Sequence, residues 1–252
     1  RSVTLTGLTD PRGYIPLKIL PGASDEAIRE TVSLASAVSL NIETAGEKHF
    51  RGLSQRKDYE NDIIRPMRLI SRLTSGGMRY ERVKQTTQFV VGAAGETDRE
   101  LVRYAGGLYE RLGLSRIYFS AYQQGLGDPG LPGERARVDG ANLLLREHRL
   151  YQSDWLIRRY GFRAGEIPFD ADGFLARDMD PKEHWARLHP ERFPVRINRA
   201  GREDLLRVPG LGPVAVRRIL DLCKKGARVR RLEDLGAATK HLRKASGYLD
   251  FA

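Results

Sequence analysis

Residues 195–222 read VRINRAGREDLLRVPGLGPVAVRRILDL, and this stretch decides how the end of the chain folds. Its centre, Val208-Pro209-Gly210-Leu211-Gly212, combines glycine and proline as tight turns do. Apolar residues at helical spacing lie on both sides, which predicts one helix over about residues 201–207 and another over about residues 213–225. Pro213 suits the first position of the second helix, because the N–H that proline lacks would have no partner there.

The glycine turn, residues 208–212, has the features of an anion site. Glycine lets the backbone approach a ligand closely and aim successive N–H groups at it, and the following helix adds its positive N-terminal end. We therefore expect a DNA phosphate to bind at the turn. Four basic side chains of the second helix would contact neighbouring phosphates: Arg217, Arg218, Lys224 and Lys225. Because none of these groups reads base edges, binding should depend strongly on salt and little on sequence.

This stretch resembles the helix-hairpin-helix family of DNA-binding modules, whose core is a hydrophobic-x-Gly-hydrophobic-Gly hairpin between two helices. The matching residues are Val208, Gly210, Leu211 and Gly212, with Asn198 upstream as a further common feature. Val216 stands where the family usually has a small alanine. The resemblance implies DNA contacts at Asn198, Gly210, Leu211, Gly212, Arg217, Arg218, Lys224 and Lys225. An ordinary helical hairpin with a glycine turn and a protein-docking role are the alternatives.

The basic charge of the chain is concentrated in its last quarter. The chain has 252 residues and a formal net charge of +11, and residues 191–252 contribute fifteen basic and seven acidic side chains, a net +8. The basic ones are Arg192, Arg196, Arg199, Arg202, Arg207, Arg217, Arg218, Lys224, Lys225, Arg228, Arg230, Arg231, Lys240, Arg243 and Lys244. This concentration favours a polyanionic partner over a merely solvated basic surface. Within it, Leu232-Glu233-Asp234-Leu235 and the basic segment that follows resemble a degenerate second half of a paired hairpin module.

The part before the hairpin alternates strands and helices. The predicted elements are strands over residues 15–20, 38–43, 88–91 and 116–122, helices after Ser24 and Thr97, and a helical excursion or lid over residues 45–84. Such alternation predicts a parallel sheet with ligand loops at the carboxyl ends of its strands. A loop over residues 123–140, a helix over residues 141–160 and a semi-ordered connector over residues 163–194 complete the prediction. We expect three regions: residues 1–140, 141–194 and 195–252.

Short segments of this α/β part resemble radical S-adenosylmethionine (SAM) enzymes. FVVGAAGET at residues 89–97 is similar to the fifth-strand motif, which lies against the adenosyl group in that family. KILPGASDE at residues 18–26 resembles the third-strand region. LNIE at residues 40–43 resembles the fourth, where polar side chains meet the ribose. Residues 116–122 would be the sixth strand.

The order of these segments resembles one branch in particular, the radical SAM proteins of DNA modification or repair, which join a partial (β/α)6 barrel to a C-terminal helix-hairpin-helix. LREHRLYQ at residues 145–152 and HPERFPV at residues 189–195 resemble the same branch. The resemblance covers nearly the whole chain. It implies an α/β fold, a partial parallel (β/α) barrel fragment followed by a small all-α helix-hairpin-helix domain. The cofactor contacts that it implies are Asn41, Glu43, Gly92, Gly95 and Glu96, although the two glutamates would serve equally well as cap or surface acids.

The resemblance also implies a function, the reductive cleavage of S-adenosyl-L-methionine at a 4Fe-4S iron-sulfur cluster by the intact protein, acting on DNA held by the hairpin. The family binds its cluster through a CxxxCxxC loop, whereas this chain has a single cysteine, Cys223, inside the predicted second hairpin helix. Since the chain starts at Arg1, we expect a fragment that lacks the cluster-binding region and is inactive alone, with unknown catalytic residues. The competing hypothesis is a non-enzymatic DNA-binding scaffold that docks a partner, for which the family suggests a uracil-DNA-glycosylase-like protein.

Several other classes of protein are excluded or disfavoured. No apolar run approaches the roughly 20 residues of a membrane span, no secretory signal is visible, and a lone cysteine fits a reducing compartment, so we expect a cytoplasmic protein without a membrane partner. His184 and His189 lack an evident third ligand, which favours hydrogen-bonded or solvated histidines over a metal site. The chain has no phosphate-binding P-loop, no Ser-His-Asp order and no zinc-finger spacing.

Overall fold

The computed structural model describes residues 13–125, 127–136, 140–236 and 240–252. The chain divides into two compact units, which we name the α/β unit (Arg1–His148) and the C-terminal unit (Arg149–Ala252). The division falls inside a long helix and leaves residues 163–194 in the same unit as the predicted hairpin. The predicted boundary after residue 140 adjoins residues 137–139, which lie outside the described part of the chain.

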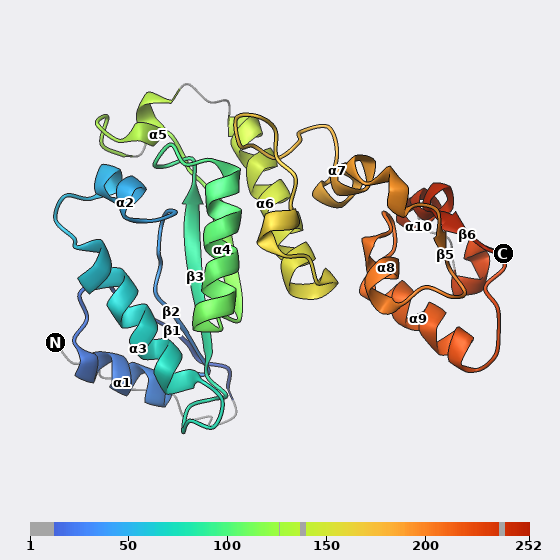
Figure 1. Cartoon of the computed structure of the whole chain (residues 1–252). Coiled ribbons are helices and arrows are strands. Elements are labelled where there is room, and N and C mark those ends of the chain that lie inside the picture. The colour runs from blue at the N-terminus through green and yellow to red at the C-terminus, as the bar shows by residue number, and fades with distance from the viewer. Residues whose placement is uncertain (1–12, 126, 137–139, 237–239) are drawn as a thin grey trace. The chain divides into compact units, whose positions relative to one another are not determined.

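The α/β unit is built on a parallel sheet of four strands in the order β1-β2-β3-β4 (Figure 1). The strands are β1 (Pro16–Lys18), β2 (Ala37–Ser39), β3 (Lys84–Val91) and β4 (Arg116–Ala121). All three neighbouring pairs are parallel, so the α/β class with a parallel sheet is confirmed. At the centre, Phe89 of β3 and Phe119 of β4 are register partners whose stacked rings lie 5.8 Å apart.

The two helices predicted after Ser24 and Thr97 are present among the helices of this unit. They are α1 (Asp25–Leu34), α2 (Glu47–Leu53), α3 (Arg65–Thr74), α4 (Asp98–Leu112) and α5 (Pro132–Arg135), with a π-helical turn over Tyr59–Ile64. The Ser24 hydroxyl accepts from the N–H of Ala27 at the start of α1. Thr97 and Glu100 form the predicted capping box of α4, which ends at Gly113 with a φ of 61°.

Two predictions for this unit were wrong in part. The second strand was expected over residues 38–43, but its regular pairing ends at Ser39, and the chain meets β3 again only at a single bridge between Glu43 and Phe89. Glu43 has a φ of 67°, which is incompatible with a continuous strand. The segment 123–140 was expected to be a loop, yet it contains the short helix α5, which starts at Pro132.

In the C-terminal unit, the connector predicted over residues 163–194 is more ordered than expected. It contains α7 (Pro181–Leu188), flanked by single 3-10 turns over Ala164–Glu166 and Pro190–Arg192. Asp180 caps α7 by accepting from the N–H of Glu183, and Pro181 takes the first helical position. Trp185 of α7 is buried, so this helix has a core of its own to pack on. The number of prolines in this segment misled the prediction, because Pro181 starts a helix instead of breaking one.

The predicted hairpin has two helices joined by a tight turn, α8 (Arg202–Arg207) and α9 (Pro213–Lys224). The preceding long helix is α6 (Gly140–Tyr160), and the later elements are a 3-10 turn over Leu232–Leu235, α10 (Lys240–Lys244) and another 3-10 turn over Ala245–Tyr248. Two short parallel strands, β5 (Val195–Arg196) and β6 (Leu249–Asp250), pair the segment before α8 with the segment after the last 3-10 turn. The all-α expectation was therefore wrong here, because these two segments meet in a small ladder.

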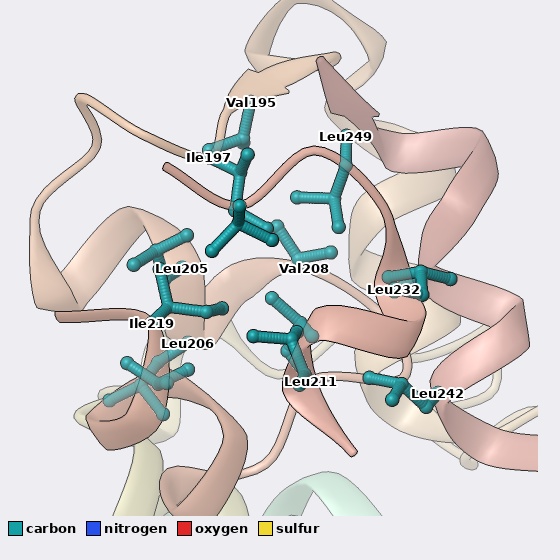
Figure 2. Packing of buried hydrophobic residues seen from close by; sticks show 14 residues of the cluster. Val195, Ile197, Leu205, Leu206, Val208, Leu211, Ile219, Leu232, Leu242 and Leu249 are labelled. Atoms are coloured by element: carbon teal, nitrogen blue, oxygen red, sulfur yellow. The ribbon is translucent and has the colours of Figure 1, made fainter. Parts of the chain in front are cut away.

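The described residues from Val195 to Phe251 pack around one apolar cluster, seen in Figure 2. Side chains of α8, the turn and α9 enter it together with side chains between Val229 and Leu249; labelled members include Leu205, Val208, Leu211, Ile219, Leu232, Leu242 and Leu249. The hairpin of α8 and α9 and the segment that follows it therefore share one core. Among the described residues, no helix has the length and apolar character to cross a membrane.

Candidate nucleic-acid interface

The candidate interface starts at the glycine turn between α8 and α9. Gly210 has a φ of 87°, a left-handed conformation that side chains other than glycine's rarely adopt. The N–H of Leu211 donates to the carbonyl of Val208 at 3.1 Å and closes the turn. Gly212 is extended, with a φ of −105° and a ψ of 171°, and Pro213 takes the first position of α9. The turn and the helix start predicted from the sequence are both confirmed.

The backbone N–H groups at the start of α9 are open. In the described chain, the N–H groups of Gly212, Val214 and Ala215 have no protein acceptor, and Val216 is the first to donate, to the Gly212 carbonyl at 3.0 Å. The first turn of α9 has no acidic side chain to offset the positive end of the helix. Val214 is 71% exposed, so this end of α9 faces solvent. An anion can therefore approach these donors.

Four basic side chains are spread along α9, two within its first turns and two at its C-terminal end. These are Arg217, Arg218, Lys224 and Lys225, and all four are exposed. Within the described part of the chain, none of them forms an ion pair. Their charge is therefore available to a polyanion, as the sequence predicts.

The side chain of Asn198 is engaged within the protein, whereas its predicted role is a contact with DNA. Its side-chain amide donates to the carbonyl of Val229 at 3.0 Å, and its side-chain oxygen accepts from the N–H of Val229 at 2.8 Å. It also donates to the carbonyl of Phe251 at 3.4 Å. These bonds use the side chain to tie the segment before α8 to the end of the module. The geometry favours a structural role for Asn198 over a direct phosphate contact.

The side chain of Leu211 also has a structural role. It is 1% exposed and belongs to the core cluster, so only its backbone is near the proposed ligand. Its carbonyl accepts a hydrogen bond from the Lys182 ammonium of α7 at 2.6 Å. Sequence reasoning missed Lys182. The Asp180-Pro181 pair, which signals the start of a helix, could have placed it on α7 but not against the turn.

A second cation, Arg207 at the end of α8, is held by aromatic rings and a carboxylate. Its guanidinium lies 3.8 Å from the ring centroid of Phe162 and 5.1 Å from that of Trp185. It also forms an ion pair with Glu166 at 3.0 Å. Arg207 counts toward the basic charge of the sequence, but these contacts use it inside the C-terminal unit.

The predicted cofactor residues lie around the carboxyl ends of β2 and β3. Asn41 is buried and Glu43 is half-buried, and the carbonyl of Glu43 accepts from the N–H of Val90 at 2.7 Å. Burial raises the pKa of Glu43, opposed by a hydrogen bond from the side chain of Asn41 and by the charges of two nearby lysines. A half-buried carboxylate with one polar neighbour can still accept a hydrogen bond from a ligand.

The protein itself uses two of the other predicted cofactor residues. The buried carboxylate of Glu96 accepts from the N–H groups of Gly92 at 2.6 Å and Ala94 at 3.0 Å, so it closes its own loop. Gly92 has a φ of 87°, and a Cβ there would lie 2.7 Å from a methyl group of Leu143. Its missing side chain therefore makes room for α6. Gly95 is exposed and has no atom within 4 Å of the position of a Cβ.

A histidine and a glutamate beside this loop form a pair that the sequence did not indicate. His49 of α2 directs Nδ1 to the Ala94 carbonyl at 3.3 Å and Nε2 to the Glu100 carboxylate at 3.0 Å. Since both partners accept, a doubly protonated ring satisfies both contacts. Burial raises the pKa of Glu100, but hydrogen bonds from Thr97 and His49 outweigh it and hold the pKa at about 2. The pair ties α2 to the start of α4.

The described residues offer little to a metal. No three His, Cys, Asp or Glu side chains among them come together in a way that could hold a metal ion. Cys223 is half-buried on α9. The ring of His189 lies 4.4 Å from that of Trp185 and faces Glu191, while Nδ1 of the neighbouring His184 is buried without a partner.

No family model, curated protein or solved structure matches the chain. A functional assignment therefore depends on the geometry of the two units and on the resemblance carried by the sequence.

Proposed function

We propose that this chain binds the sugar-phosphate backbone of duplex DNA without sequence preference, as part of a radical SAM protein of DNA modification or repair. In this proposal the C-terminal unit contains a helix-hairpin-helix module that grips the DNA. The α/β unit is the C-terminal part of a partial (β/α) barrel.

The observation that carries the proposal is the glycine turn with its open donors. Gly210 in the left-handed region and Gly212 before α9 present N–H groups at the positive end of a twelve-residue helix. The exposed cations along α9, Arg217 and Arg218 nearer this end and Lys224 and Lys225 at the other, can contact further phosphates along the strand. Amide donors and cations that are directed at phosphates carry no sequence information, which supports binding that tolerates any sequence.

A second hairpin half supports a paired module. The 3-10 turn over Leu232–Leu235 and α10 bury Leu232, Leu235 and Leu242 in the cluster that also holds α8 and α9. Gly236, between them, has a φ of 104°. Paired halves that share a core would present two phosphate-binding ends on one rigid body. The residues 237–239 of the second half lie outside the described part of the chain.

The radical SAM half of the proposal is supported by the sheet and only partly by the cofactor residues. Four parallel strands in consecutive order are compatible with a segment of a barrel. Of the predicted contacts, Glu43 is half-buried, Gly95 is exposed and Asn41 is buried with its side chain bonded to Glu43, whereas Gly92 and Glu96 are used by the protein itself. The first three fit the adenosyl and ribose groups of SAM in character.

The iron-sulfur cluster does not fit this chain. Such clusters are held by several cysteine thiolates, and Cys223 is the single cysteine of the sequence. It lies on α9 in the C-terminal unit, far along the chain from the sheet. We therefore derive no catalytic step for these residues. This disagreement is the observation that favours the second candidate function, a DNA-binding scaffold whose α/β unit docks a partner such as a uracil-DNA-glycosylase-like protein.

Binding of SAM separates the two candidates. If the α/β unit is a cofactor domain, equilibrium dialysis of the whole chain should detect saturable binding of labelled SAM. Glu43→Gln should weaken it about tenfold, because the variant removes a charged hydrogen-bond acceptor. Glu47→Gln, on the exposed and ion-paired start of α2, is the matched control and should bind normally. Absence of saturable binding would favour the scaffold.

The DNA-binding proposal is tested by the whole chain and labelled duplexes of unrelated sequence. Fluorescence anisotropy should give dissociation constants that agree within about twofold among duplexes, because phosphate contacts carry no sequence information. Affinity should fall about a hundredfold between about 50 and 200 mM salt, as expected for some four phosphate contacts. A strong preference for one sequence, or no binding at low salt, would refute the proposal.

A further inference from the structure

A buried lysine contacts the backbone of the glycine turn from behind. Lys182 of α7 is 6% exposed, and its ammonium donates to the carbonyl of Leu211 at 2.6 Å. Burial of a lysine is costly unless its charge is used. The hydrogen bond to Leu211 is a use of that charge.

The carbonyl that Lys182 holds belongs to the same peptide as the N–H of Gly212. This peptide is trans, so its C=O and N–H point in opposite directions. Because the Leu211 carbonyl is held toward Lys182, the Gly212 N–H must point away from the interior of the unit. That N–H has no acceptor among the described residues, as the preceding geometry shows. The orientation of one peptide plane thus links a buried cation to an N–H group that is proposed to donate a hydrogen bond to phosphate.

The surroundings of Lys182 leave its ammonium little freedom. It lies 4.6 Å from the ring centroid of Tyr160, and the Tyr160 hydroxyl lies 3.4 Å from where a Cβ of Gly212 would be. The helix that carries Lys182 is in turn tied to α10, where Lys244 pairs with Asp180 at 3.1 Å and with Glu183. The lysine is therefore presented to the turn by packed elements of one unit.

We propose that Lys182 is a positioning residue, which orients the Leu211–Gly212 peptide so that the Gly212 N–H faces a bound phosphate. The inference deepens the DNA-binding function proposed above and rests on it. Without the ammonium, the carbonyl of Leu211 is free to rotate toward the ligand. A carbonyl oxygen there would repel a phosphate, and the N–H donor would be lost at the same time.

The charge of Lys182 adds a pH dependence to this arrangement. Burial, opposed by the charge of Asp180 and assisted by that of Arg207, lowers the pKa of Lys182 to about 7. Below this pH the ammonium holds the carbonyl with a charge-assisted bond, and above it the neutral amine holds it more weakly. The other charged or titratable groups near it are Glu183 and His184 on α7, Tyr160 of α6 and Lys244 of α10.

The test compares the whole chain with Lys182→Met, which keeps an unbranched side chain one atom shorter and removes the donor. We expect duplex affinity at pH 6 to fall about five- to tenfold, the size of one net hydrogen bond. The slope of affinity against salt should not change, because Lys182 is buried and neutralises no phosphate. Lys244→Met is the matched control: it removes the same charge and another tether of α7, and its affinity should stay within about twofold of the wild type.

A nuclear magnetic resonance titration reads the peptide directly and does not need DNA. In the wild type, the Gly212 amide signal should shift with a midpoint near pH 7, and in Lys182→Met this step should be absent. If the wild type failed to bind duplex but showed this step, the DNA-binding function would fall and the positioning role would stand. If the amide did not titrate near pH 7, or if Lys182→Met bound duplex as tightly as the wild type, the positioning role would be wrong. Should Lys182→Met fail to fold, the wild-type titration decides alone.

Discussion

Replacing Gly210 with valine should weaken binding of a DNA duplex at least tenfold. Gly210 has a φ of 87°, and a β-branched residue in this region costs at least about 1–2 kcal/mol. The chain relieves that strain by abandoning the turn, which removes the N–H groups of Gly212 and the start of α9 from their common orientation. Anisotropy with a labelled duplex at about 50 mM salt measures the loss.

The control for this prediction is the same substitution at Gly226. This glycine has a φ of 76° and no atom within 4 Å of where a Cβ would be, so valine adds strain of the same kind at the C-terminal end of α9. Both variants should lose thermal stability, but Gly226→Val should keep its affinity within about threefold. If both lost affinity equally, the effect would come from instability of the module. If Gly210→Val bound normally, the turn would not be the phosphate site.

Removing the charge of α9 should have the larger effect on binding. A variant with glutamine at all four predicted contacts, Arg217, Arg218, Lys224 and Lys225, should bind at least a hundredfold more weakly at about 50 mM salt. Each cation that leaves a phosphate reduces the salt slope by about 0.9, so the slope should fall by up to about 3.6. The side chains are exposed and without ion pairs in the described chain, so the fold should be little affected.

The matched control removes the same charge from the α/β unit. Its four substitutions to glutamine are at exposed arginines: Arg29, Arg56, Arg72 and Arg82. The net charge of the chain falls by the same amount, but the salt slope should remain close to that of the wild type. If the two variants lost affinity to the same degree, DNA would be held by the overall charge and not by α9.

The two predictions separate the parts of the proposed interface. A variant at Gly210 should lose affinity with little change in salt slope, because backbone amides release no counterions. The charge variant should change the slope itself. A third pattern, a loss of affinity that depends on pH and not on salt, is expected only for Lys182. Together these patterns distinguish amide donors, surface cations and the buried positioning cation.

The cofactor residues illustrate where the sequence was insufficient. Glu96 looks like a residue at a strand end that is free to reach a ligand, yet its carboxylate bonds to the N–H groups of Gly92 and Ala94 in its own loop. Gly92 looks like a glycine that admits a ligand, yet Leu143 fills the space above it. A short pattern specifies that a glycine or an acid is present, but not which part of the protein occupies its surroundings.

Elements whose causes lie within a few residues of one another could be predicted from the sequence. The turn at Gly210, the start of α9 at Pro213 and the capping box of Thr97 were all predicted, because turn and cap chemistry acts between near neighbours. The parallel sheet was predicted from alternating apolar segments, although the early end of β2 was not.

Only the tertiary structure decided which side chains serve the turn and which serve the ligand. The bond between Lys182 and Leu211 spans 29 positions, and the bonds between Asn198 and Val229 span 31. Neither separation leaves a periodic trace in the sequence, because each pair meets only after separate elements have packed. The sequence therefore located the proposed phosphate site, and the fold assigned Asn198 to the scaffold and a buried lysine to the site.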